Sequence, residues 1–165
     1  MIERKLELMI INIGFIADTL LDSFERHKIK KYIKEKILYS KNVILLGKII
    51  KVYYPSDKYS NLLREQGYFL YRSKVDQINH DYLLCKIFLS LGEKEREKWL
   101  NETYLKNKFK EEETTDAIVI KDGDLIAVEV ITPSYTKDKI KNKKDFINNY
   151  CDDSIVINTK GLKVY

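Results

Sequence analysis

The Asp122-Gly123 pair restricts the fold of this chain more than any other short motif, because it lies between two apolar runs. An Asp-Gly pair in that setting is among the strongest local signals of a β-hairpin. If the loop has only these two residues, counting outward along both strands places Asp116 opposite Glu129. Facing side chains in an antiparallel pair have Cβ atoms about 4.5–5.5 Å apart. The sequence therefore predicts two neighbouring carboxylates on one face of a sheet.

Two like charges in such a position destabilise a hairpin unless something offsets their repulsion. A divalent cation, Mg²⁺ or Mn²⁺, bound by Asp116 and Glu129 would do so, because hard cations prefer oxygen ligands. A metal held in this way can orient a water nucleophile and stabilise charge on a phosphate. The alternative is that both carboxylates lie at solvated strand ends, or that a longer loop changes the register.

The excess positive charge lies in the first third of the chain. Residues 1–55 contain eleven Lys and Arg against six Asp and Glu, whereas residues 56–165 contain nineteen of each. Apolar spacing predicts helices over about 2–13, 16–23 and 26–39, followed by two β-rich runs separated by Gly47-Lys48. Three helices and a hairpin in this order are typical of a winged helix-turn-helix, whose third helix enters the major groove of DNA.

The expected DNA contacts are the basic side chains of the third helix and the wing: Arg26, Lys28, Lys31, Lys34 and Lys48. The alternative is that this segment does not bind DNA. The segment 1–55 would then be a small helical cap whose lysines only keep the protein soluble.

Composition excludes several classes of protein and leaves a chain of two domains. No apolar run approaches the ~20 residues that span a bilayer, and the N-terminus has no signal-peptide pattern, so we expect a cytoplasmic protein without a membrane partner. The isolated cysteines and histidines exclude a disulfide framework and a structural zinc site. We predict a winged helix-turn-helix at 1–55, a connector at 56–75 and a second domain at 76–165. Its predicted elements are helices at 76–91 and 135–148 and strands at 116–121, 124–131, 154–159 and 162–165.

The order of these elements resembles the PD-(D/E)XK restriction-endonuclease-like fold, with Thr115-Asp116 in place of the PD and Glu129-Val130-Ile131 in place of the (D/E)XK. A winged helix ahead of such a domain resembles replication-relaxation type proteins of mobile elements. The resemblance implies an α+β protein with an N-terminal winged helix-turn-helix and a C-terminal nuclease-like α/β domain. It also implies metal-dependent cleavage of DNA, and a homodimer.

One position departs from the family motif, because Ile131 stands where the motif has lysine. Some members of the fold supply the lysine from the next helix, and Lys137 is the first choice among five lysines between positions 137 and 144. Asp116, Glu129 and Lys137 are then the expected catalytic residues. Glu102 is a further candidate metal ligand if its segment forms the first strand.

Two functions follow from these observations. The first is a metal-dependent DNA endonuclease, and the second is a DNA-binding regulator or replication accessory protein whose nuclease-like domain is inactive. A third, a protein-interaction module, is less favoured because the positive charge is localised and the third helix is basic.

Overall fold

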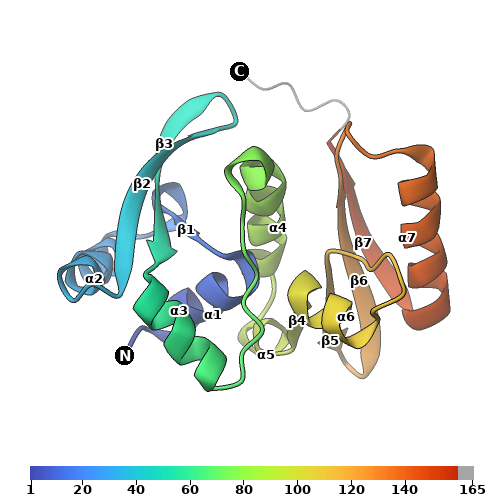
Figure 1. Ribbon diagram of the computed structural model, residues 1–165, viewed down its shortest axis with the longest axis horizontal. Helices are drawn as coiled ribbons and strands as arrows, with labels where there is room; N and C mark the ends of the chain where they lie inside the picture. Colours follow the sequence, from blue (N-terminus) through green and yellow to red (C-terminus); the bar gives the residue numbers. More distant parts are fainter. Residues whose placement is uncertain (160–165) are drawn as a thin grey trace. The chain divides into compact units, whose positions relative to one another are not determined.

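The computed structural model describes residues 1–159, which form an α+β fold with two sheets. The described residues divide into two compact units, 1–82 and 83–159. Figure 1 shows the helices and strands of each unit. The strand predicted at 162–165 lies outside the described residues. Within residues 1–159, no helix combines the length and apolar character needed to cross a membrane.

The first unit is built from helices on a small sheet. Helix α1 buries most of its length and ends at Gly14, whose φ of 88° is left-handed. Helix α2 begins after Asp22, whose side chain accepts from the Glu25 backbone N–H while Glu25 accepts in return, forming a capping box. The elements are α1 (Arg4–Ile13), β1 (Ile16–Ala17), a 3₁₀ turn η1 (Asp18–Leu20), α2 (Ser23–Lys34), β2 (Leu38–Leu45), β3 (Lys48–Pro55), α3 (Asp57–Glu65) and η2 (Val75–Gln77).

The sheet of the first unit has the order β1-β3-β2, with both pairings antiparallel. The predicted hairpin is confirmed, but its turn is Leu46-Gly47, one residue earlier than expected, because Leu45 pairs with Lys48. The helix predicted at 16–23 is wrong. Residues 16 and 17 pair with β3 instead, and a 3₁₀ turn follows them.

The segment 56–75, predicted as a connector, packs within the first unit. Tyr59 and Leu63 of α3 are buried. The backbone N–H of Tyr71 donates to the carbonyl of Ile11 at 2.9 Å. This segment therefore completes the core around α1.

The second unit contains a four-stranded sheet of order β4-β5-β6-β7, in which β4, β5 and β6 are antiparallel and β7 is parallel to β6. Phe146 of α7 and Leu105 of α6 pack on Ile118 at one face of the sheet. Phe88 of α4 meets Trp99 of β4 edge-on at the other face, with ring centroids 5.3 Å apart. The elements are α4 (Ile78–Ser90, which begins in the first unit), α5 (Glu93–Glu97), β4 (Trp99–Asn101), α6 (Glu102–Lys108), β5 (Ala117–Lys121), β6 (Asp124–Ile131), α7 (Lys137–Tyr150) and β7 (Asp153–Asn158).

Candidate functional site: two carboxylates and a buried lysine

The β5–β6 hairpin brings Asp116 and Glu129 together. Its turn is Asp122-Gly123, with φ of 51° and 90°. The observed register pairs Ala117 with Val128, so the predicted register is confirmed. The next residues outward, Asp116 and Glu129, each accept a backbone hydrogen bond from the other strand. The Asp116 N–H donates to Glu129 Oε2 at 3.0 Å, and the Val130 N–H donates to Asp116 Oδ2 at 2.8 Å. Ile118 packs against Phe146 of α7, and Asp116 precedes it by two residues on the same strand line, so both side chains are on one face of the sheet. Glu129 lies opposite Asp116, so both carboxylates are on the face that α7 covers.

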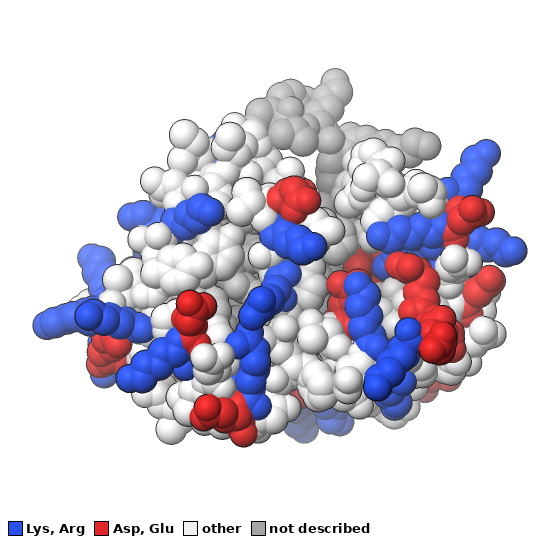
Figure 2. All heavy atoms as spheres, in the orientation of Figure 1, with Lys and Arg blue, Asp and Glu red and all other residues white. Residues whose placement is uncertain are grey.

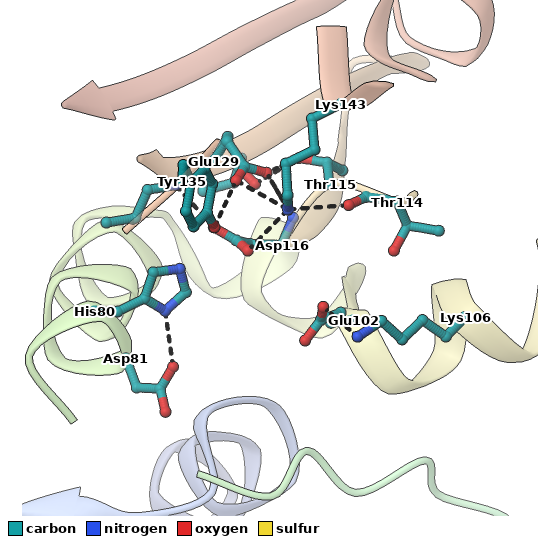
Figure 3. A network of polar contacts seen from close by, with 12 residues as sticks. His80, Asp81, Glu102, Lys106, Thr114, Thr115, Asp116, Glu129, Tyr135 and Lys143 are labelled. Atoms are coloured by element: carbon teal, nitrogen blue, oxygen red, sulfur yellow. Dashed lines mark hydrogen bonds and ion pairs between the residues drawn. The ribbon is translucent and has the colours of Figure 1, made fainter. Parts of the chain in front are cut away.

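A lysine from α7 lies against the two carboxylates. Lys143 Nζ is 3.0 Å from Glu129 Oε1, 3.1 Å from Glu129 Oε2 and 3.5 Å from Asp116 Oδ1. It also donates to the carbonyl of Thr114 at 3.1 Å. Figure 3 shows the ammonium group at the meeting point of these contacts. The site thus combines two carboxylates and one cation from three successive elements.

The prediction of Lys137 as the lysine of this site is corrected by the structure. Lys137 is the first residue of α7 and its side chain is exposed, whereas Lys143 is buried. The physical reason is helical periodicity: Lys143 falls on the same side of α7 as the buried Phe146, and Lys137 points away from it. One signal in the sequence could have identified Lys143, because it falls within the apolar stripe formed by Ile140, Phe146 and Ile147.

Two hydroxyl groups hold the Glu129 carboxylate in place. The Tyr135 hydroxyl, in the loop before α7, donates to Oε1 at 3.1 Å. The Thr115 hydroxyl lies 3.0 Å from Oε2 and 2.8 Å from the carbonyl of Val128. Lys139 Nζ lies 4.3 Å from the centroid of the Tyr135 ring, which adds a cation–π contact to that side of the site. None of these contacts was predicted from the sequence, because the loop conformation that supplies Tyr135 has no local motif.

Burial sets the electrostatics of the site. Asp116, Glu129 and Lys143 are only 5%, 2% and 3% exposed. Burial raises the pKa of the Glu129 carboxyl, and the charge of Asp116 raises it further, against the opposing effect of Lys143. Burial alone would lower the pKa of Lys143, but Asp116 and Glu129 together outweigh it, so the pKa lies above its ordinary value. The lysine is therefore charged at neutral pH.

The pKa of Tyr135 is also raised, by burial first and then by the charges of Asp116 and Glu129. Its phenol therefore stays protonated and able to donate to Glu129 at neutral pH. With one cation and two acidic groups, the cluster carries more negative than positive charge whenever both carboxyl groups are ionised. That surplus is what a further cation would neutralise.

The oxygen atoms around Lys143 have the chemistry that a hard cation prefers. Besides the two carboxylates, the Thr114 hydroxyl oxygen is buried and has no hydrogen-bond partner within the described residues. Glu102 directly follows the first strand of this sheet, β4, and pairs with Lys106 at 2.6 Å. Among residues 1–159, no group of three or more His, Cys, Asp and Glu side chains is placed to hold a metal. At this site Asp116 and Glu129 are the two carboxylates whose oxygens suit a hard cation.

The predicted DNA contacts lie on α2 and on the β2–β3 hairpin of the first unit. Lys31, Lys34 and Lys48 are exposed. Lys31 lies 3.8 Å from Glu35 of the same helix. Figure 2 shows Lys and Arg side chains projecting at the position of α2, with acidic side chains beside them.

The other two predicted contacts have partners within the unit. Arg26 pairs with Asp18 at 3.3 Å and remains about half exposed. Lys28 pairs with Glu3 at 2.5 Å and lies 4.2 Å from the centroid of the Phe24 ring. Lys28 is therefore held against α1 rather than standing free on the basic face.

Comparison of the chain with family models, with curated proteins and with solved structures gave no match.

Proposed function

We propose that the second unit is a metal-dependent endonuclease domain that hydrolyses phosphodiester bonds in DNA. The observation that carries the proposal is the contact of Lys143 Nζ with both Asp116 and Glu129, at 3.5 and 3.0 Å. A buried ammonium beside paired carboxylates is the combination of groups that the nuclease-like motif requires, and the motif position itself holds Ile131. Lys143 takes the place that the resemblance assigned to Lys137.

Asp116 and Glu129 would hold the metal, since their oxygens already surround the one cation of the site. A bound divalent ion supplies an activated water and neutralises charge on the phosphate. The role of Lys143 is to stabilise the negative charge that develops on the phosphate oxygens, because its pKa keeps it protonated. Tyr135 and Thr115 orient the Glu129 carboxylate through their hydroxyl groups.

The first unit supports DNA as the substrate. It has two helices, α1 and α2, ahead of the β2–β3 hairpin, and strand β1 with a 3₁₀ turn stands where the winged helix-turn-helix order has its middle helix. Exposed lysines on α2 and on the hairpin offer contacts to phosphates. We propose that this unit binds the duplex and delivers it to the carboxylate site.

The test of the enzyme proposal combines metal binding with cleavage. Calorimetry with Mg²⁺ and Mn²⁺ should show binding that Glu129→Gln abolishes. Supercoiled DNA should be nicked with either metal and not with EDTA. Lys143→Met should lower the rate by about 10²–10³, the usual loss for one group that stabilises a transition state. Lys144→Met, at an exposed neighbouring position on α7, should leave the rate unchanged.

Circular dichroism of each variant separates loss of activity from loss of fold. If Lys143→Met is unfolded, Glu129→Gln decides the question, since it leaves Asp116 paired with Lys143. Cleavage that survives in a folded Glu129→Gln protein would contradict the proposal.

A second candidate is a DNA-binding regulator or replication accessory protein of a mobile element, with an inactive nuclease-like domain. The observation that favours it is that Lys143 itself neutralises charge at the carboxylate site. Lys143 Nζ already contacts both carboxylates, so one of their two negative charges is offset without a metal. If calorimetry finds no metal binding at millimolar concentration and Glu129→Gln keeps full DNA affinity, the regulator is the better description.

A further inference from the structure

The tip of the β2–β3 hairpin exposes two isoleucines side by side. Ile44 and Ile49 are cross-strand partners, and 69% and 77% of their surfaces are exposed. Side chains that face each other in an antiparallel pair lie on the same face of the sheet, so the two isoleucines form one small apolar patch. The neighbouring Val43 and Leu45 are buried. The alternation between positions 42 and 45 shows that Ile44 and Ile49 are directed outward at the tip, whereas Leu38 and Tyr53, on the same face nearer the base, are buried.

The surroundings of the tip are basic. Next to the isoleucines on the same face is the exposed pair Asn42 and Lys51, and Lys48 follows the turn. Residues 38–55 contain three lysines and no Asp or Glu. An apolar partner surface alone would not require this excess of positive charge. The complementary partner is a polyanion that also offers an apolar interior.

The tip is held in a defined conformation. Leu46 and Gly47 have φ of 49° and 77°, the positive values of a tight two-residue hairpin turn. The N–H of Leu46 donates to Asn79 Oδ1 at 2.9 Å, and both residues belong to the first unit. A held loop loses little conformational entropy when it inserts into a partner.

We propose that Ile44 and Ile49 form a wedge that enters the minor groove of duplex DNA and partly unstacks one base step. Apolar side chains used in this way kink the duplex by roughly 20–90° and are flanked by Lys, Arg or Asn that contact the groove. Here Asn42 and Lys51, on the same face as the isoleucines, provide those flanking groups. The inference rests on the proposed DNA binding and adds to it a bent DNA as the bound form.

The experiment uses a short duplex with dyes at both ends and 2-aminopurine at a central TA step, because TA steps unstack easily. The test variant is Ile44→Thr/Ile49→Thr, which keeps β-branched residues in the strands. The matched control is Val156→Thr, which changes an equally branched, 49% exposed residue of strand β7 in the second unit.

Wild type and control should increase both energy transfer between the dyes and 2-aminopurine fluorescence. The double variant should lose both signals and bind at least tenfold more weakly. Its dependence of affinity on salt should be unchanged, since that slope reports phosphate contacts and the lysines remain.

Four results would overturn the wedge. Salt-dependent binding by wild type without bending or unstacking removes the wedge but leaves the DNA interface in place. The same holds if the double variant behaves like wild type. A third result is that the free wild-type protein is a dimer and the double variant is a monomer that still bends and unstacks DNA as wild type does. The isoleucines would then contact a second copy of the chain. Absence of salt-dependent binding by wild type removes the DNA interface itself.

Discussion

An ammonium group is costly to bury, since the penalty for leaving water is several kcal/mol per ion even after the protein relaxes. Lys143 bears this penalty because Asp116 and Glu129 offset it, and each carboxylate needs the lysine for the same reason. Removal of any one member changes the electrostatic environment of the other two. The three side chains should therefore be treated as one ionisable unit.

The raised pKa of Glu129 makes stability depend on pH. A carboxyl group whose pKa is higher in the folded state binds its proton more readily when folded, so the free energy of unfolding falls as the pH rises from the ordinary value through the raised one. A difference of one pH unit between the two pKa values corresponds to about 1.4 kcal/mol. We predict that Glu129→Gln removes this decline, measured by urea unfolding at a series of pH values from mildly acidic to neutral.

The control is Glu113→Gln, because Glu113 is exposed. This variant should keep the wild-type decline. An identical pH profile for wild type and Glu129→Gln would mean that Glu129 has no raised pKa in the folded protein.

At the scale of elements, the β5–β6 hairpin depends on one glycine. Gly123 has a φ of 90°, and an added Cβ would meet no atom within 4 Å. The cost of Gly123→Ala is therefore conformational alone, about 1–2 kcal/mol for a left-handed non-glycine residue. Urea unfolding should show that loss, with the slope of the transition unchanged. Asp122→Asn should show none, since Asn-Gly suits the same turn, and an unaffected Gly123→Ala protein would contradict the turn type.

Elements with a local cause could be predicted from the sequence. Both hairpins could be predicted from a glycine in the turn, although the β2–β3 turn lies one residue earlier than predicted, and the register of β5 and β6 follows from the Asp-Gly loop. The start of α2 also has a local signal, the Asp22–Glu25 capping box, which the apolar spacing alone did not reveal. Strand β1 has no such signal. It forms because Ile16 and Ala17 pair with residues more than thirty positions away.

The residues of the candidate site likewise differ in whether a local sequence signal determines their position. Asp116 and Glu129 could be predicted because a single turn fixes their pairing. Lys143 and Tyr135 could not be chosen in the same way, because their contacts depend on how α7 and the preceding loop dock on the sheet. The lysine within the apolar stripe of α7 was the one available clue.

At the scale of the whole molecule, the charge is distributed unevenly, with the excess confined to residues 1–55. We predict that Lys31→Glu/Lys34→Glu weakens DNA binding at least tenfold, about 1.4 kcal/mol. Both side chains are exposed, so the fold should be retained. Fluorescence anisotropy at fixed salt measures the change.

The matched control is Lys141→Glu/Lys144→Glu, which reverses two exposed lysines of α7 in the second unit. A smaller loss is expected from it. Equal losses from the two double variants would mean that the first unit is not the main DNA-binding part of the chain.

The order in which the site's residues are synthesised has a consequence for how the chain folds as it leaves the ribosome. Asp116 and Glu129 emerge before Lys143, and for that interval the nascent hairpin has its two acidic groups and no lysine. Closing it at neutral pH would press two anions together. We therefore expect the hairpin and α7 to become stable together, and we predict that a nascent chain arrested before Lys143 leaves its last strands unpaired and exposed to aggregation.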